Sequence, residues 1–368
     1  MHALAETLPF PPASAASAAG WARRSPDFRL DPLAFAPWDA HVATHPAATI
    51  FHTAGWARVL HETYGHTPFY QGRLEAGRCP DLLPIMEVTS ALTGRRGVSL
   101  PFTDFCAPLA SGGNSAARNW ELALRLGRAR GWKYFESRGL GGAPTDARPA
   151  LAFYGHELDL ALPEDKLFAG FAPGVRRAIR KAQAEQVEIE IQTDLAAVQA
   201  YYALHCQTRQ GHGVPPQPFR FFASIHRHLL ARGLGWVIQA RCRDQIVASA
   251  IFFQFGRRAV YKFGASDRSF QAFRPNNLLM WEAIKWHAAH GFASLHFGRT
   301  SLANEGLRRF KLGFGSREEC LEYFRYDFRQ GGFVTTTDRA AGWLNALFRR
   351  LPRPLLRGLG AALYPHLA

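Results

Sequence analysis

Two stretches of this 368-residue sequence resemble each other and decide the fold. The first, NWELALRLGRARGWKYFESRG, covers residues 119–139, and the second, MWEAIKWHAAHGFASLHFGRT, covers residues 280–300. Each begins with Trp-Glu in a helical pattern, reaches a glycine that stops the helix, and continues into a strand. Gly131 and Gly291 are 160 residues apart, and the Trp-Glu pairs are 161 apart, so one residue must be gapped. A period this long indicates two tandem domains rather than a solenoid.

Strand-like runs precede both stretches. In the second half, the runs at 235–241, 246–255 and 258–265 predict three strands before a helix over 277–290. Shorter runs between residues 68 and 102 precede the first stretch. We therefore expect an α/β (α+β) fold in which each domain has a mixed twisted sheet flanked by helices.

Composition shifts suggest where the domains begin and end. Ala, Pro and Ser dominate the N-terminus, which predicts a disordered tail. The remaining chain divides into an N-terminal domain, a C-terminal domain with the active site, and a basic amphipathic segment. The predicted bounds are 1–28 for the tail, 29–163 and 164–330 for the domains, and 331–368 for the segment.

The charge balance is strongly basic. Forty-four Lys and Arg against 29 Asp and Glu leave a net charge of +15. Such a field favours anionic partners such as nucleotides, phosphorylated lipids, tRNA or a membrane surface, although an Arg-rich proteome would produce the same balance. The five cysteines are odd in number and form no CxxC pair, which argues against a zinc ribbon or a disulfide framework. We expect reduced thiols and no metal site.

The termini bear on location. The N-terminus has no cationic start and no sustained apolar core, so we expect no secretory signal, and no apolar run is long enough for a membrane span. These features predict a cytoplasmic protein. Residues 343–363 mix leucines with Arg349, Arg350, Arg353 and Arg357. This pattern suits peripheral contact with the inner face of a membrane, and it equally suits a helix packed on the second domain.

A first basic cluster lies in the predicted helix 174–182. Arg176 and Arg180 are four residues apart, as are Arg177 and Lys181, so two basic rows lie side by side. Such rows can hold a diphosphate or an RNA backbone, and a solvated helix face would show the same pattern.

A second cluster surrounds the end of the predicted strand 258–265. Tyr261 lies on this strand, Ser266 follows it, and Asn276 and Asn277 come at the start of the next helix, where we expect one of them to be the N-cap. Helix N-termini bind anions, so these residues are candidates for substrate binding as well as capping.

A third cluster follows the strand of the second repeat. Arg299 comes directly after that strand, which is a usual active-site position in α/β folds. Lys311 lies between Phe310 and Leu312, so we expect its ammonium to be partly desolvated and able to stabilise an oxyanion or a leaving group. The structural alternative is a lysine whose stem covers the core while its head reaches solvent.

The order of these motifs resembles the FemAB family, and more narrowly its relatives in bacterial exopolysaccharide and exosortase (PEP-CTERM) systems. The resemblance spans roughly residues 30–326. It rests on Arg176-x3-Arg180-Lys181-Ala182, Tyr261-x-Phe-Gly-Ala-Ser266, Pro275-Asn276-x-Leu278, Trp281, Phe297-Gly-Arg299 and Gly306-x3-Phe310-Lys311-x2-Phe314-Gly315, with Trp56, Leu83-Pro84 and Ser99-Leu-Pro-Phe-Thr-Asp104 in the first half.

The resemblance implies two GNAT-type domains and transfer of an acyl or aminoacyl group to an amine. Family members use aminoacyl-tRNA or acyl-CoA as the donor, with no permanently bound cofactor. The chain lacks the coiled-coil arm of some tRNA-using members, and it lacks a Gly-rich (Q/R)xxGxG loop before the helix at Asn277. The donor therefore stays open between the two classes.

The resemblance assigns roles to the candidate residues. It implies that Lys311 stabilises the developing charge and that Arg299 orients a phosphate. Tyr261, Asn276 and Ser266 would line the cleft, and Arg176 and Arg180 would hold an anionic carrier. The expected acceptor is an amine-bearing glycan or a lipid-linked envelope precursor. DNA is not expected as a partner.

Two other functions fit the same features. A non-catalytic protein could retain the fold to bind an anionic glycolipid of an exopolysaccharide system. A tRNA-binding module fits the charge, but the basic residues are not interleaved with an aromatic platform.

Overall fold

The computed structural model describes residues 28–75, 78–110, 115–139, 143–144, 147–336 and 343–367. The predicted tail therefore lies outside the described residues, apart from Phe28. The first half contains β1 (Phe28–Leu30), α1 (Trp38–Val42), α2 (Ala54–Tyr64), β2 (Thr67–Pro68), β3 (Tyr70–Glu75), β4 (Arg78–Leu83), β5 (Met86–Ser90), β6 (Gly94–Val98), α3 (Ser115–Arg130), β7 (Tyr134–Arg138) and β8 (Leu151–Asp159).

The second half is longer and is followed by two helices near the C-terminus. It contains α4 (Glu164–Gly170), α5 (Pro173–Ala184), β9 (Glu188–Gln192), α6 (Leu195–His212), α7 (Phe219–His228), β10 (Gly235–Cys242), β11 (Gln245–Phe255), β12 (Arg258–Ser266), α8 (Pro275–Ala289), β13 (Ser294–His296), β14 (Thr300–Ser301), α9 (Glu305–Leu312), β15 (Arg317–Asp327), β16 (Gly332–Phe333), α10 (Trp343–Arg350) and α11 (Arg353–Leu363).

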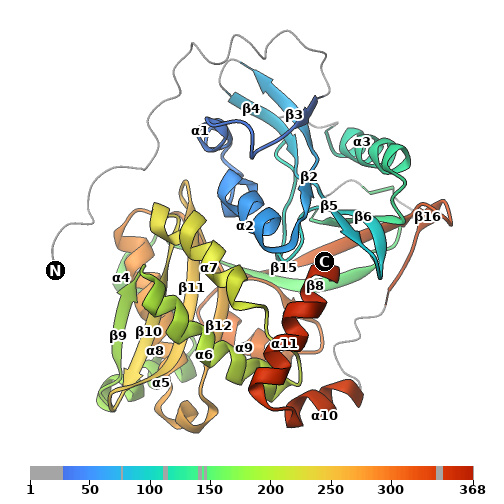
Figure 1. The fold of residues 1–368 in the computed structure, drawn as a ribbon. Helices are drawn as coiled ribbons and strands as arrows, with labels where there is room; N and C mark the ends of the chain where they lie inside the picture. Colours follow the sequence, from blue (N-terminus) through green and yellow to red (C-terminus); the bar gives the residue numbers. More distant parts are fainter. Residues whose placement is uncertain are drawn as a thin grey trace.

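Most strands belong to one mixed sheet that runs through both halves (Figure 1). Its order is β2-β5-β6-β7-β15-β8-β13-β12-β11-β10-β9, and β1, β3 and β4 form a separate three-stranded sheet. Helices pack on the large sheet, so the predicted α/β (α+β) class with a mixed, helix-flanked sheet is confirmed.

The two repeats form matching units. In each unit a helix connects two parallel strands, giving β6-α3-β7 in the first half and β12-α8-β13 in the second. Gly131 follows α3 with φ +64°, and Gly291 follows α8 with φ +75°. This left-handed conformation suits glycine and ends each helix where the sequence predicted.

The halves exchange their following strands. β8 comes after β7 in the chain but pairs with β13, whereas β15 comes after β13 and pairs with β7 as well as β8. Each half therefore completes the sheet of the other. The predicted boundary between residues 163 and 164 falls between β8 and α4 and stays a prediction.

The second half has helices on both faces of its sheet. Along β10, Val237 faces a core that includes α6 and α7, and Trp236 and Ile238 face a core that includes α5 and α8. This alternation follows from the two-residue period of a strand. Consequently α5 and α6 lie on opposite faces of the sheet.

Helices also join the two halves. α2 of the first half packs on α7 of the second, where the rings of Trp56 and Phe221 meet edge to face with centroids 6.2 Å apart. Gly55 permits this close approach, because a Cβ there would lie 2.7 Å from the side chain of Leu229. Buried apolar side chains form the centre of the interface, and at its edge His228 Nε2 lies 2.7 Å from Glu62 Oε2.

One local prediction is wrong. Neither Asn276 nor Asn277 caps α8, because the helix begins at Pro275 and its N-cap is Arg274, with φ +59° and no side-chain cap bond. Proline favours the first helical position because it has no N–H that needs a partner. The Asn276 amide instead donates to Ser266 Oγ at 3.2 Å.

The C-terminal helices pack on α6. Leu356 and Gly360 are buried there, whereas Leu344, Leu347 and Leu355 remain exposed. Within the part of the chain that the structure describes, no helix combines the length and apolar character needed to cross a membrane.

Candidate active site

The site begins where β12 and β13 separate. The two strands pair only from Arg258 to Val260, and β12 then continues to Ser266 without β13. A register shift between β11 and β12 leaves Lys262 as an extra residue between Tyr261 and Phe263. Bulges of this kind redirect side chains and are common beside active sites. The separation opens a cleft at the carboxyl end of β12, where α/β folds bind ligands.

The wider part of the cleft is the Arg209 cavity, with a volume of about 470 Å³. It lies between α6 and the second half of β12, and residues of the first half and of the C-terminus also line it. The lining residues are Phe102, Thr103, Asp104, Arg138, Tyr201, His205, Thr208, Arg209, His212, Gln217, Lys262, Phe263, Gly264, Arg299 and Tyr364. Four are Lys or Arg and one is acidic, so the cavity is suited to an anionic ligand.

The narrower part is the Asn276 cavity, of about 200 Å³. The structure brings three predicted residues together here, namely Tyr261, Ser266 and Asn276. The cavity shares Thr208 and Gly264 with the Arg209 cavity, so the two are adjacent. A Cβ at position 264 would overlap the Tyr261 hydroxyl, so the glycine leaves room for that hydroxyl.

Lys311 is buried on α9, only 2% exposed. Its Nζ donates to the carbonyl oxygens of Gly298 at 2.9 Å and Arg299 at 3.0 Å, and it lines none of the cavities described here. Burial lowers the pKa of its ammonium to about 8, with Asp104 opposing the shift and Lys262 adding to it. The predicted desolvation is thus confirmed, and the contacts show that Lys311 holds the turn carrying Arg299.

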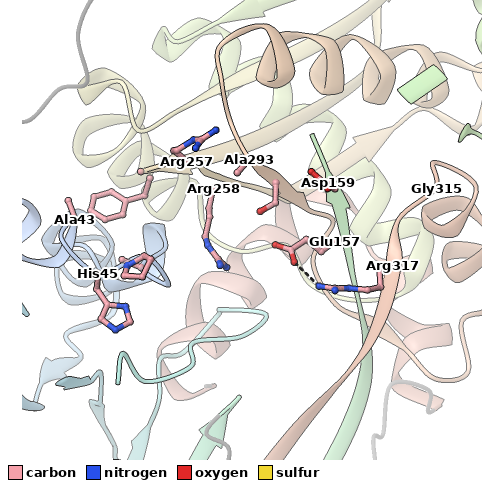
Figure 2. Close-up of a pocket in the computed structure, with 14 residues that line it drawn as sticks. Ala43, His45, Glu157, Asp159, Arg257, Arg258, Ala293, Gly315 and Arg317 are labelled. Carbon is pink, nitrogen blue, oxygen red and sulfur yellow. Dashed lines mark hydrogen bonds and ion pairs between the residues drawn. The ribbon is translucent and has the colours of Figure 1, made fainter. Parts of the chain in front are cut away.

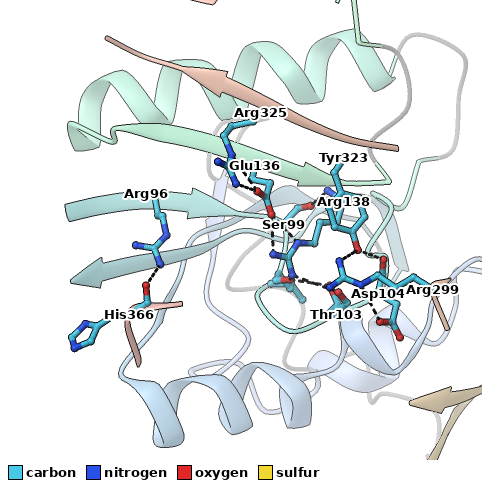
Figure 3. Close-up of polar contacts among 11 residues, drawn as sticks. Arg96, Ser99, Thr103, Asp104, Glu136, Arg138, Arg299, Tyr323, Arg325 and His366 are labelled. Carbon is cyan, nitrogen blue, oxygen red and sulfur yellow. Dashed lines mark hydrogen bonds and ion pairs between the residues drawn. The ribbon is translucent and has the colours of Figure 1, made fainter. Parts of the chain in front are cut away.

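Arg299 lines the Arg209 cavity, and Figure 3 shows its contact with Tyr323. Its Nη1 donates to the Tyr323 hydroxyl at 3.0 Å, and its guanidinium lies 4.4 Å above the Phe153 ring. The side chain remains 39% exposed. Arg299 is therefore held in place by aromatic groups while its charge stays available to a ligand.

Sequence reasoning did not select Asp104 as a site residue, yet it lies at the centre of the site. It comes from the first half, and its Oδ1 lies 3.0 Å from Lys262 Nζ and 3.9 Å from Arg299 Nε. Burial raises the pKa of this carboxyl, but Lys262 and Arg299 outweigh that effect and hold it below its usual range. The signals in the sequence are the motif Ser99-Leu-Pro-Phe-Thr-Asp104 and the position of Asp104 as a lone acid in the apolar run Leu100–Leu109.

Arg176 and Arg180 lie away from this cleft. Both are on α5, on the opposite face of the sheet from α6, and neither lines a cavity described here. Arg180 is exposed, with its guanidinium 5.8 Å from the Phe168 ring. The basic residues beside the cleft come instead from α6, β12 and the loop after β13.

The matching position in the first half is closed by a buried ion network (Figure 3). Arg138 donates to Glu136 Oε1 through Nε at 3.0 Å and Nη2 at 2.8 Å, and Arg325 of β15 binds Oε2 of the same carboxylate. Arg138 Nη1 also donates to the Leu100 carbonyl at 3.2 Å. Glu136 and Arg138 are 4% and 5% exposed, so little room is left for a ligand between them.

A larger cavity, about 660 Å³, lies at the opposite end of β12 (Figure 2). Arg257, Arg258 and Arg317 line it together with Glu157 and Asp159, and Arg317 pairs with Glu157 at 3.4 Å. None of the predicted site residues lies there. Acidic and basic side chains largely balance in this cavity, whereas the Arg209 cavity is predominantly basic.

Within the described ranges, no group of three or more His, Cys, Asp or Glu side chains is placed to hold a metal ion. Cys79, Cys106, Cys206 and Cys242 are buried free thiols, and Cys320 is an exposed one.

One protein-family profile matches part of this chain. Residues 171–325 match the sequence profile of the acetyltransferase (GNAT) domain. Among curated proteins, no sequence relative matches the chain.

Solved structures share the fold at low sequence identity. FemX superposes with a TM-score of 0.64 at 13% identity, covering 83% of this chain and 98% of its own. L-PGS from Bacillus licheniformis gives 0.51 at 11% identity, covering 91% and 98%. A tandem GNAT protein from the clavulanic acid biosynthesis pathway gives 0.51 at 13%, covering 82% and 98%. The chain thus shares the fold of these solved structures, and its residues 171–325 match the acetyltransferase (GNAT) domain profile.

Proposed function

We propose that this protein is an N-acyltransferase that moves an acyl or aminoacyl group onto the amine of a cell-envelope or exopolysaccharide precursor. The observation that carries the proposal is the junction of two cavities at Gly264 and Thr208. A narrow cavity at the strand separation meets a wide basic one there, which allows two substrates to meet end to end. The GNAT domain match over residues 171–325 supports the reaction class.

The reaction forms one bond and breaks one. The acceptor nitrogen attacks the acyl carbonyl carbon, and the C–S bond of an acyl-CoA or the C–O bond of an aminoacyl-tRNA breaks. The amine loses one proton, and the departing thiolate or alkoxide takes up one proton, so the reaction balances. In this proposal the Asn276 cavity, lined by Tyr261, Ser266 and Asn276, binds the acyl-bearing end of the donor. The Arg209 cavity binds the anionic acceptor. Both donor classes are substrates, so no permanently bound cofactor is required.

Lys311 and Arg299 act on charge in different ways. Arg299 reaches the cavity and orients a phosphate or carboxylate of the substrate. Lys311 is a positioning residue, because it holds the carbonyl groups of Gly298 and Arg299 and adds a buried positive charge behind the cleft. An ammonium has three donors, and these two bonds use two of them. Such fixed charges stabilise a developing oxyanion without reorganising during the reaction.

Arg176 and Arg180 have a separate role in the proposal. Because they lie on α5, they could contact only a long substrate that extends across the other face of the sheet. A lipid-linked carrier or a tRNA is long enough. FemX and L-PGS have the same fold. The product analysis described below identifies the substrate.

Peripheral contact with the inner face of a membrane is part of the proposal. Leu344, Leu347 and Leu355 are 43%, 47% and 62% exposed, and arginines flank them. We expect the full chain to float with anionic vesicles, and a variant with all three leucines changed to Ser to remain in solution. Leu92→Ser, at a 72% exposed leucine of the first half, is the control. Equal flotation of all three proteins would exclude the contact.

The donor is identified by product analysis. The purified full chain is incubated with an acyl-CoA pool or an aminoacyl-tRNA pool and an amine-bearing glycan precursor, and mass spectrometry detects the modified amine. We expect a product with one donor class and its loss in Lys311→Ala, while Lys285→Ala, at a surface lysine of α8, retains activity. Saturable binding of the precursor without any product would favour the non-catalytic alternative.

A further inference from the structure

The C-terminal segment, residues 343–366, lies along the helix that lines the cleft (Figure 1). α10 and α11 both pack on α6. The backbone approaches are close, because a Cβ at Gly213 would overlap the Asn345 carbonyl and one at Gly360 would overlap the Pro216 carbonyl. Gln210 of α6 donates to the Leu351 carbonyl at 2.8 Å. The segment is therefore a packed part of the structure.

Its end is attached to both halves. Tyr364 lines the Arg209 cavity, and its hydroxyl accepts a hydrogen bond from Arg209 Nη2 at 2.8 Å. Two residues later, the His366 carbonyl accepts a bond from Arg96 Nη2 at 2.7 Å in the first half (Figure 3), and the His366 ring contacts Ser90 Oγ at 2.9 Å. The segment thus crosses beside the cleft and contributes to its wall.

A third cavity lies between this segment and the cleft. The Arg268 cavity, about 360 Å³, is lined by Gln207, Thr208, Gln210, Gly211, Ser266, Arg268 and Arg349. It shares Thr208 and Ser266 with the Asn276 cavity. Among the residues that the structure describes, its two charged lining residues are both arginines, and no carboxylate lines it.

The two arginines come from different elements. Arg268 follows β12 directly, and Arg349 is on α10. Both are exposed, so their guanidinium groups are available to a ligand. Two like charges facing one cavity repel each other, and an anion between them removes that repulsion. Arginine binds phosphate oxygens through paired N–H groups, which makes phosphate the best-matched ligand.

We propose that the Arg268 cavity binds the phosphate or diphosphate group of a substrate, and that Arg349 makes the C-terminal segment part of this binding site. The inference deepens the proposed function, because the phosphate would belong to the same substrate whose other end reaches Tyr261 and Asn276. Coenzyme A carries a diphosphate, and the 3′ end of tRNA carries phosphodiesters. Both sources share the chemistry that Arg268 and Arg349 recognise.

The test measures binding rather than transfer. Calorimetric titration of the full chain with inorganic pyrophosphate, and separately with coenzyme A, compares Arg349→Ala with Arg350→Ala. Arg350 is the next residue of the same exposed helix and lines none of the cavities described here. We expect about tenfold weaker pyrophosphate binding in Arg349→Ala, consistent with the loss of one charge-assisted pair. Arg350→Ala should remain within about twofold.

A second pair of variants tests the cavity itself. Arg268→Ala should weaken pyrophosphate binding as Arg349→Ala does, and the double variant should weaken it no more than the two single effects combined. Equal losses in Arg349→Ala and Arg350→Ala would indicate only general charge attraction and would overturn the inference. Unsaturable pyrophosphate binding by the wild-type chain would overturn it as well.

Coenzyme A distinguishes the two sources of phosphate. If the Arg349→Ala effect appears with pyrophosphate and coenzyme A, the site serves a nucleotide donor; if it appears with pyrophosphate and tRNA fragments but not with coenzyme A, it serves tRNA. If the chain has transfer activity but its affinity for pyrophosphate is unchanged in Arg349→Ala, this inference is refuted and the proposed function stands. Arg349-dependent binding without any transfer would instead refute the proposed function.

Discussion

The β6-α3-β7 and β12-α8-β13 units have the same architecture, but only the second leaves a cleft. In both, the parallel pairing is short. Taking Gly131 and Gly291 as equivalent, Arg138 corresponds to Gly298. In the first unit the Arg138 guanidinium binds Glu136 and also lines the Arg209 cavity. In the second, Gly298 has no side chain and its carbonyl is held by Lys311.

The comparison teaches how a duplicated fold divides its work. A single guanidinium in place of a glycine converts an opening into a structural ion network. The first unit then contributes to the site of the second, because Asp104 follows β6 and reaches Lys262. In the proposed function the first unit supplies the ion network and Asp104, and the second supplies most of the substrate site.

The largest expected effect concerns the closed opening. Glu136→Gln leaves Arg138 and Arg325 without their carboxylate, and we expect a loss of about 3–5 kcal/mol in the free energy of unfolding. Urea unfolding at pH 7 measures it. Glu282→Gln, which breaks a surface pair with Lys285, should lose less than about 1 kcal/mol. A similar loss of unfolding free energy in both variants would show that the buried network does not stabilise the first half.

The same variant has a defined pH dependence. Burial raises the pKa of Glu136, but Arg138 and Arg325 outweigh it and hold the pKa below the usual 4.5. Because the folded pKa is depressed, this stabilisation is complete above about pH 4.5 and is lost as the pH falls through the folded pKa. The difference between wild type and Glu136→Gln should therefore shrink as the pH falls below the usual 4.5 of a glutamate carboxyl.

The next effect concerns the open cleft. Lys311→Met should reduce the transfer rate by about 10²- to 10³-fold, the usual cost of losing a fixed charge that stabilises an oxyanion. Because the folded pKa of Lys311 is about 8, the charged form is lost as the pH rises through 8, and the wild-type rate should fall there. Lys285→Met should keep both the rate and the profile. A wild-type rate that climbs steadily to pH 9.5 would contradict the role of the ammonium.

The smallest effect compares two glycines. A Cβ at Gly97 would overlap the Trp132 ring in the core of the first unit, whereas one at Gly264 would overlap the Tyr261 hydroxyl in the cleft. Gly97→Ala should cost about 1–3 kcal/mol of stability, as overpacking does. Gly264→Ala should lower kcat/KM by about tenfold, equivalent to 1.4 kcal/mol, with little change in urea midpoint. If Gly97→Ala lowered kcat/KM and Gly264→Ala lowered stability instead, the first unit would be the one that binds substrate.

Much of the fold could be predicted from local patterns. The repeat and the glycines that end α3 and α8 depend on neighbours within a few residues. The capping prediction for Asn276 and Asn277 failed because Pro275 competes for the helix start, and its fixed φ wins over a side-chain bond.

The site could be predicted only in part. Tyr261, Ser266 and Asn276 lie within one strand-turn-helix, and they do line a common cavity. Asp104 was missed because it is 158 residues from its partner Lys262. Arg176 and Arg180 were selected for their helical spacing, which shows that two charges share a helix face but not what that face meets.

By itself the sequence determined the duplication, the α/β class and the residues that end each helix, because these follow from short-range sterics and hydrophobic periodicity. Only the tertiary structure decided which duplicate is open, that Asp104 crosses into the second half, and that Arg349 from the C-terminal segment faces Arg268. These depend on long-range packing, which brings together charges that are far apart in the sequence and which no local pattern encodes.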